Sequence, residues 1–121
     1  MKLRLDKEAK TGLYLGTEIE EKWWRRYMKD KLFARGNGRY WHDDRAFYFR
    51  RYLTKKPIVI PFVSVSEIKV GKWHAGRWCS GHPVMKIVWI KDGLALSSGF
   101  LVSKNKEEFS GLLAELRQRI S

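Results

Sequence analysis

Three groups of residues in this chain have the types and spacing needed for chemistry, and the largest group is basic. Residues 22–56 hold 12 Lys and Arg against 3 Asp, a net charge of +9 within a chain of 121 residues whose net charge is +12. Lysine and arginine attract phosphates and carboxylates by charge, and arginine adds a planar fork of donors. The bases around the expected first hairpin form a candidate anion-binding site: Arg25, Arg26, Lys29, Lys31, Arg35 and Arg39. The alternative is a solvated basic surface with no partner.

The second group interleaves aromatic rings with arginine. Alternation along residues 45–53 predicts that Tyr48, Arg50 and Tyr52 share one strand face, with Trp41 on the neighbouring strand. Rings that stack on bases, beside cations that bind the backbone, are typical of single-stranded nucleic-acid binding. The alternative is ordinary sheet surface, because cross-strand aromatic and arginine pairs also stabilise sheets and no nucleic-acid motif accompanies this face.

The third group lies in the glycine-rich loop 71–83, where His74, Cys79 and His82 are possible zinc ligands. Their spacing matches no standard zinc finger, the chain has no Cys-x2-Cys pair, and a fourth ligand would have to come from His42. We therefore expect packing rather than a metal, and we predict no cofactor.

The same loop also offers a contact surface. Trp73, Arg77 and Trp78 would present aromatic rings and a charge to a membrane or a partner protein. The alternative is that both rings fold back onto the rest of the domain, as tryptophan commonly does.

Catalytic patterns do not stand out. Asp43 and Asp44 are adjacent in an expected turn and would point apart, and no Ser-His-Asp set is apparent. The sequence Gly36-Asn37-Gly38 lacks the following Lys-Ser/Thr of a phosphate-binding loop. We expect a protein that is not an enzyme.

Short runs of aromatic and β-branched residues predict the elements that must position these groups. Asn37-Gly38 and Asp92-Gly93 are typical of hairpin turns, since both residues of such turns need positive φ. About seven antiparallel strands are expected, over residues 23–31, 39–42, 45–53, 58–60, 62–70, 84–90 and 94–102.

One segment has helical periodicity. Phe109, Leu112, Leu113, Leu116 and Ile120 form a single apolar stripe, and Asn105 with Glu108 fits a capping box. The stripe must cover the β core, so we expect a small barrel closed by a C-terminal amphipathic helix.

The length suits one domain, and we expect it over residues 21–121 after a weakly patterned lead-in segment, 1–20. The single cysteine excludes an intrachain disulfide, and the charged N-terminus is unlike a signal peptide. Apolar runs such as 57–63 are far shorter than the roughly 20 residues that span a bilayer. We expect a cytoplasmic protein that touches the inner membrane surface peripherally, if at all.

The order of elements resembles a pleckstrin-homology (PH)-like domain of the bacterial PH or GRAM-like branch. The resemblance covers residues 20–120 and rests on Gly38-Arg39-Tyr40-Trp41-His42-Asp43-Asp44-Arg45-Ala46-Phe47-Tyr48-Phe49, on Ile60-Pro61-Phe62 leading to Ile68, and on the terminal helix, 106–120. It implies a bent barrel of seven strands in two near-orthogonal sheets, with the last helix across one end.

The resemblance also implies a binding or adaptor role rather than catalysis. Phosphoinositide-binding members carry a basic motif in the first hairpin, but Trp41 stands two positions after Arg39, where that motif has an arginine. We therefore expect an anionic partner of a looser kind, a membrane headgroup or an acidic protein surface. The alternatives are single-stranded nucleic acid and a protein-interaction or oligomerisation role.

Overall fold

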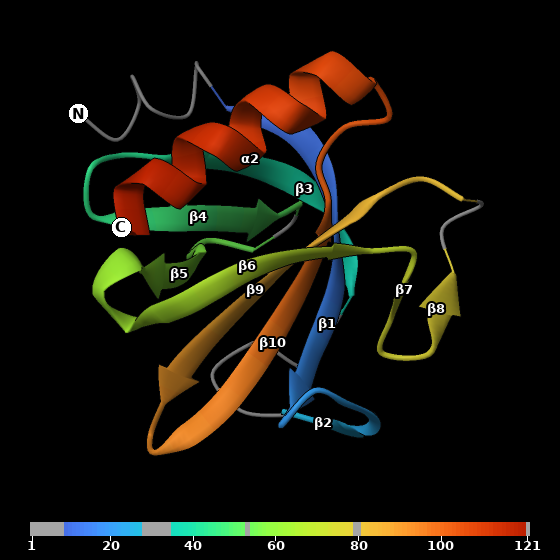
Figure 1. Cartoon of the computed structure of the whole chain (residues 1–121), viewed down its shortest axis with the longest axis vertical. Helices are drawn as coiled ribbons and strands as arrows, with labels where there is room; N and C mark the ends of the chain where they lie inside the picture. Colours follow the sequence, from blue (N-terminus) through green and yellow to red (C-terminus); the bar gives the residue numbers. More distant parts are fainter. Residues whose placement is uncertain (1–8, 28–34, 53, 79–80, 121) are drawn as a thin grey trace.

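The computed structural model describes residues 9–27, 35–52, 54–78 and 81–120 and shows a strongly bent antiparallel sheet with a helix across one end (Figure 1). The strands of the main sheet are β1 (Lys10–Ile19), β2 (Lys22–Arg26), β3 (Gly36–His42), β4 (Ala46–Arg51), β5 (Ile58–Pro61), β6 (Val65–Gly71), β9 (Val84–Lys91) and β10 (Leu94–Leu101). A 3-10 turn, η1 (Phe62–Ser64), precedes β6, the hairpin of β7 (Trp73–His74) and β8 (Arg77–Trp78) follows it, and helix α2 (Lys106–Ile120) follows β10.

Within the described residues, hydrogen bonds join seven strands in the order β5-β4-β3-β1-β10-β9-β6, and β2 pairs with β1 beside this path. β1 therefore connects the two halves of the bent sheet, because β3 and β10 are its neighbours on either side. The mainly β fold with a C-terminal helix, predicted from the sequence pattern, is confirmed.

Four fully buried aromatic rings hold these halves together. The ring centroid of Phe100, on β10, lies 5.4 Å from Tyr14 on β1, and 5.0 and 5.5 Å from Phe47 and Phe49 on β4. Such large apolar contacts dominate the energy of a small core. The alternation predicted for β9 is confirmed, since Met85, Ile87 and Trp89 are all buried.

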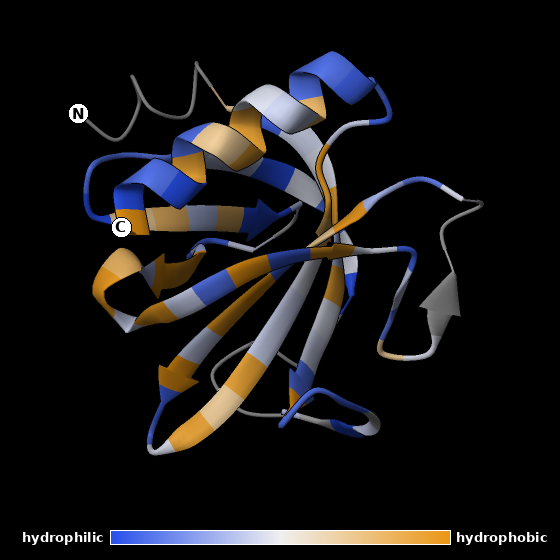
Figure 2. Ribbon diagram, viewed as in Figure 1, coloured by the Kyte–Doolittle hydropathy of each residue, from blue (hydrophilic) through white to orange (hydrophobic). Residues whose placement is uncertain are grey.

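Helix α2 covers one end of this core. Phe109 and Leu116 are buried in it, and hydrophobic positions recur along the helix between hydrophilic ones (Figure 2). Asn105 caps the helix, because its side-chain oxygen accepts the N–H of Glu108 at 2.9 Å. In the expected capping box the Glu108 side chain would accept the N–H of Asn105. That N–H donates to Ser103 Oγ instead.

β1 lies where the sequence predicted only a lead-in segment over residues 1–20. Residues 10–19 pair with β2, β3 and β10 in the middle of the sheet. Two polar side chains of this strand are buried, because Thr17 hydrogen-bonds Ser98 at 2.7 Å and Glu18 contacts the β7–β8 hairpin. Gly16, with φ of 103°, also shifts the register, which interrupts the alternation after Tyr14.

The hairpin turn predicted at Asn37-Gly38 is wrong, since both residues lie inside β3 and pair with Leu13 and Gly12. The glycine is needed there for a close approach rather than for a turn. A Cβ on Gly38 would lie 2.1 Å from the backbone oxygen of Arg50 on β4. The second predicted turn is confirmed, because Asp92 and Gly93 both have positive φ, at 52° and 77°.

Two other boundaries differ from the expectation. The predicted strand 62–70 begins with η1, and β6 starts at Val65. The expected loop 71–83 contains the β7–β8 hairpin, with a tight turn at Ala75 and Gly76, whose φ values are 50° and 79°. Of the predicted strand 23–31, β2 occupies the first part, while residues 28–34 lie outside the described chain.

Candidate functional site

One outer surface of the sheet gathers arginine and aromatic side chains from three strands. Arg39 on β3 lies directly opposite Arg50 on β4, and Thr11 on β1 is the partner of Arg39 on the other side. Paired residues of antiparallel strands point to the same face, with Cβ atoms about 5 Å apart. We call this surface the arginine face; it consists of Thr11, Leu13, Asn37, Arg39, Trp41, Tyr48, Arg50 and Tyr52.

The arginine pair brings two like charges together. Arg39 is exposed, and within the described chain its side chain has no hydrogen bond or ion pair. Like charges opposite each other in a sheet destabilise it, and a bound anion would remove that repulsion. The pair therefore has the charge and spacing to hold a phosphate or a carboxylate.

Trp41 and Tyr48 form the next pair along the same two strands. Their rings stack with centroids 5.4 Å apart and an interplanar angle of 11°. The Tyr48 hydroxyl donates to Asp43 Oδ2 at 2.8 Å, which fixes this ring. Burial, together with that hydrogen bond and the charge of Asp43, raises the pKa of Tyr48, so the phenol stays neutral.

Asp43 is the acidic residue at the edge of this pair. Burial raises the pKa of its carboxyl, but hydrogen bonds from the Arg45 and Ala46 N–H groups and from Tyr48 together outweigh burial and lower it. The charged carboxylate therefore closes the β3–β4 turn, and its hydrogen bonds are directed into the turn.

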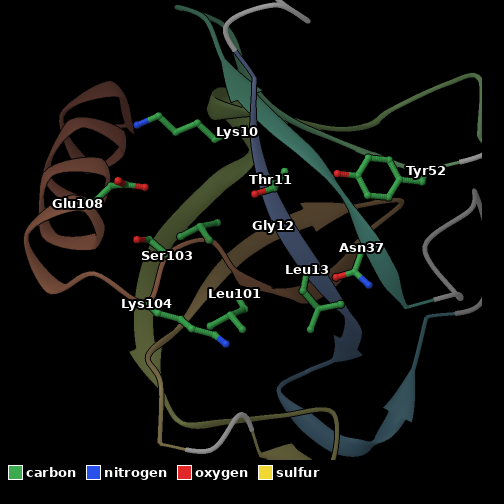
Figure 3. Close-up of a pocket in the computed structure, with 11 residues that line it drawn as sticks. Lys10, Thr11, Gly12, Leu13, Asn37, Tyr52, Leu101, Ser103, Lys104 and Glu108 are labelled. Atoms are coloured by element: carbon green, nitrogen blue, oxygen red, sulfur yellow. The ribbon is translucent and has the colours of Figure 1, made fainter.

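On the other side of the arginine pair the surface opens into a groove of about 900 Å³ (Figure 3). Thr11 and Leu13 on β1 lie at its centre, Asn37 and Tyr52 lie on one side, and the β10–α2 connection lies on the other. Tyr52 is 51 % exposed, and its backbone N–H donates to the backbone oxygen of Asn37. The groove is also lined by Lys10, Gly12, Leu101, Val102, Ser103, Lys104 and Glu108.

The six bases of the predicted hairpin site lie in different surroundings. Arg25, on β2, pairs with Glu20 at 2.6 Å. Arg35 donates to the backbone oxygens of Leu15 and Ala75. Arg39 lies on the arginine face, whereas Lys29, Lys31 and the side chain of Arg26 lie outside what the structure describes. The structure thus does not bring the described members of this set together.

The outer surface of the β1–β10 pair has a different character, because the β7–β8 hairpin contacts it. The His74 ring donates from Nε2 to the Gly16 oxygen at 2.9 Å, and the Ala75 N–H donates to Glu18 Oε2 at 2.7 Å. A Cβ on Gly99 would lie 2.3 Å from the His74 ring. We call this surface, made of Gly16, Glu18, Ser97 and Gly99, the covered face.

The covered face contains groups that sequence reasoning missed. Glu18 is only 5 % exposed, and its Oε1 lies 3.8 Å from His74 Nδ1; Ser97, its β10 partner, is fully buried. Burial lowers the pKa of His74 despite the nearby Glu18 carboxylate, so the ring is neutral at pH 7. No sequence signal indicated this cluster, because its members come from segments some 60 residues apart.

The possible zinc ligands are placed as follows. His74 uses Nε2 to bind the backbone, and His42 Nε2 lies 3.1 Å from Glu115 Oε1 on α2. Cys79 lies outside the described residues, among which no group of three His, Cys, Asp or Glu side chains could hold a metal ion.

Of the predicted loop contacts, Trp73 points outward and is 60 % exposed. Its neighbour His74 points inward, since successive strand residues alternate. The side chains of Arg77 and Trp78 lie outside what the structure describes. Within the described segments no helix has the length and hydrophobicity to cross a membrane.

Comparison with known proteins agrees with this architecture. No curated protein matches the chain. A family model described as "Bacterial PH domain-like" matches residues 4–116, and so includes β1 and most of α2. The matched segment covers nearly the whole chain, and the chain therefore belongs to the bacterial PH domain-like family.

Proposed function

We propose that this chain is a non-catalytic binding module that recognises an anionic partner through the arginine face. One observation carries the proposal, namely that Arg39 and Arg50 lie opposite each other on neighbouring strands of the outer sheet surface. Two arginines paired across neighbouring strands offer many donors to one phosphate or carboxylate, whether it belongs to a headgroup, a protein or another polymer. Family membership supports a binding role in general.

The contrast between Arg39 and the other described arginines of the predicted hairpin site supports this choice of surface. Arg25 has a carboxylate partner, and Arg35 is occupied by backbone oxygens. Glu18 on β1 and His74 on β7, the residues whose types most suggest acid–base chemistry, are buried between the sheet and the hairpin. A buried pair of this kind has no room for a substrate, which supports binding rather than catalysis.

The test compares two charge-matched double variants on an immobilised polyanion such as heparin. Arg39→Gln/Arg50→Gln should elute at clearly lower salt than the parent protein, because two contacts between arginine and the anionic groups of the polymer are lost. Lys22→Gln/Arg25→Gln, on β2, has the same net charge and should elute close to the parent. Circular dichroism checks that both variants are folded.

The opposite pattern would overturn the proposal. If the β2 variant loses retention and the arginine-face variant keeps it, the bases of β2 and not the arginine face form the binding site. If the two variants elute together, retention depends on net charge alone and no specific face exists.

A further inference from the structure

We propose that the arginine face binds single-stranded nucleic acid, with arginines contacting phosphates and aromatic rings contacting bases. This inference rests on the proposed function, because it names the anionic partner. It is carried by the order of side chains across the face rather than by charge alone.

The arginine pair is flanked by aromatic side chains on both sides. The pair Trp41–Tyr48 lies on one side of it, toward the β3–β4 turn. Tyr52, with Asn37, lies on the other side. Alternate residues of a strand are about 6.6 Å apart, which is close to the spacing of successive nucleotides in an extended strand. A nucleic-acid chain running along the strands would therefore meet a ring, a cation pair and a second ring in turn.

The Trp41–Tyr48 stack is already arranged for bases. The two rings are nearly parallel, and the hydrogen bond from Tyr48 to Asp43 holds one of them in place. A planar base can extend such a stack without reordering side chains, so little conformational entropy is lost on binding. Tyr52, half exposed at the other side of the arginines, offers a second ring.

The groove beside Tyr52 gives the nucleic-acid backbone a continuation (Figure 3). It contains the hydroxyl groups of Thr11 and Ser103 and the cation of Lys104, and these groups are suited to phosphate and sugar oxygens. Lys10 lies at the end near α2. The polar groups of the groove thus extend the recognition surface beyond Tyr52.

The aromatic side chains favour nucleic acid over the other anionic partners. An acidic peptide would use the arginines and leave the rings without a role. A membrane would need apolar side chains that project from the surface, whereas Trp41 and Tyr48 are half buried and stack on each other within the sheet surface.

The experiment measures fluorescence anisotropy of three labelled probes with the full chain: a 20-nucleotide oligo(dT), an abasic strand of the same length, and polyglutamate. Oligo(dT) should bind at least tenfold more tightly than the abasic strand, which has the same phosphates without bases. If the abasic strand binds equally well, the bases are not recognised and the inference fails while the proposed function stands. Stronger binding of polyglutamate than of oligo(dT) assigns the face to an acidic protein and also overturns the inference.

Variants separate the two kinds of contact. Tyr52→Ala, at an exposed position, should weaken oligo(dT) about fivefold or more and leave the abasic strand unchanged. Arg39→Gln/Arg50→Gln should weaken both strands and reduce the slope of log K against log salt by about 1.4. Lys22→Gln/Arg25→Gln is the matched control. If no probe binds at 50 mM salt, the inference and the proposed function both fail.

Discussion

The two outer surfaces of this sheet are built from the same strand, β1, yet they use their polar residues in opposite ways. On the covered face, Glu18 binds the Ala75 N–H and the backbone at Gly16 binds His74, so the polar groups hold the β7–β8 hairpin in place. On the arginine face, Arg39 and Arg50 lie opposite each other on neighbouring strands. Polar groups that bind one another across two elements stabilise a fold, whereas two like charges on an outer surface suit an anionic partner.

The largest change in stability should come from a substitution on the covered face that fills the space under the hairpin. Gly99→Ala places a Cβ 2.3 Å from the His74 ring, so the ring must move and its hydrogen bond to Gly16 is strained. We expect a loss of about 1–3 kcal/mol in the free energy of unfolding, measured by urea denaturation. Binding of polyanions by the folded variant should not change.

Gly111→Ala is the matched control for that experiment. A Cβ there, in the middle of α2, meets nothing within 4 Å, so the variant should be more stable by about 0.5–1 kcal/mol. If Gly99→Ala were as stable as the parent protein, the hairpin would not be packed on the covered face.

A smaller effect should appear on acidification. Burial depresses the pKa of His74 below its ordinary 6.5, opposed by Glu18 and aided by the Lys86 and Arg35 charges. The folded state therefore disfavours the protonated ring. The contribution of His74 to the free energy of unfolding is complete above pH 6.5 and is lost as the pH falls from 6.5 through the lowered pKa of the folded state.

His74→Gln isolates this contribution, because glutamine can still donate to the Gly16 oxygen but does not titrate. Between pH 7.0 and pH 5.5 the urea midpoint of unfolding should fall further for the parent protein than for the variant. Equal falls would mean that His74 protonation does not oppose folding.

The smallest effect should come from the arginine face. Arg39 is exposed, so Arg39→Gln should change the free energy of unfolding by about 0.5 kcal/mol or less. The change should be a gain at low salt, since repulsion from Arg50 is removed, and it should vanish as salt is added. A clear loss of stability would show that Arg39 is a structural residue.

Much of the fold could be predicted because apolar periodicity is local. The stripe from Phe109 to Ile120 predicted α2, and alternation of Met85, Ile87 and Trp89 predicted the core side of β9. β1 could not be predicted in the same way. Its Thr17 and Glu18 are buried by partners from distant segments, and their types alone indicate exposure.

The candidate site was predictable in part, because alternation along a strand is also a local pattern. Alternation placed Tyr48 and Arg50 on one strand face, with Trp41 on the neighbouring strand, but it could not reveal that Arg39 lies opposite Arg50. The sequence grouped Arg39 with the hairpin bases, and only the register of β3 and β4 places it against Arg50. The mistaken turn at Asn37-Gly38 hid this register, because a turn there would shorten β3.

The most direct test of the arginine face is a titration of the ¹⁵N-labelled chain with oligo(dT), followed by backbone amide shifts. Our account predicts that the largest shifts fall between residues 37 and 52, in β3, β4 and the turn after them, with small shifts in the β7–β8 hairpin. Shifts concentrated in β2 or in residues 73–78, with β3 and β4 unchanged, would contradict it.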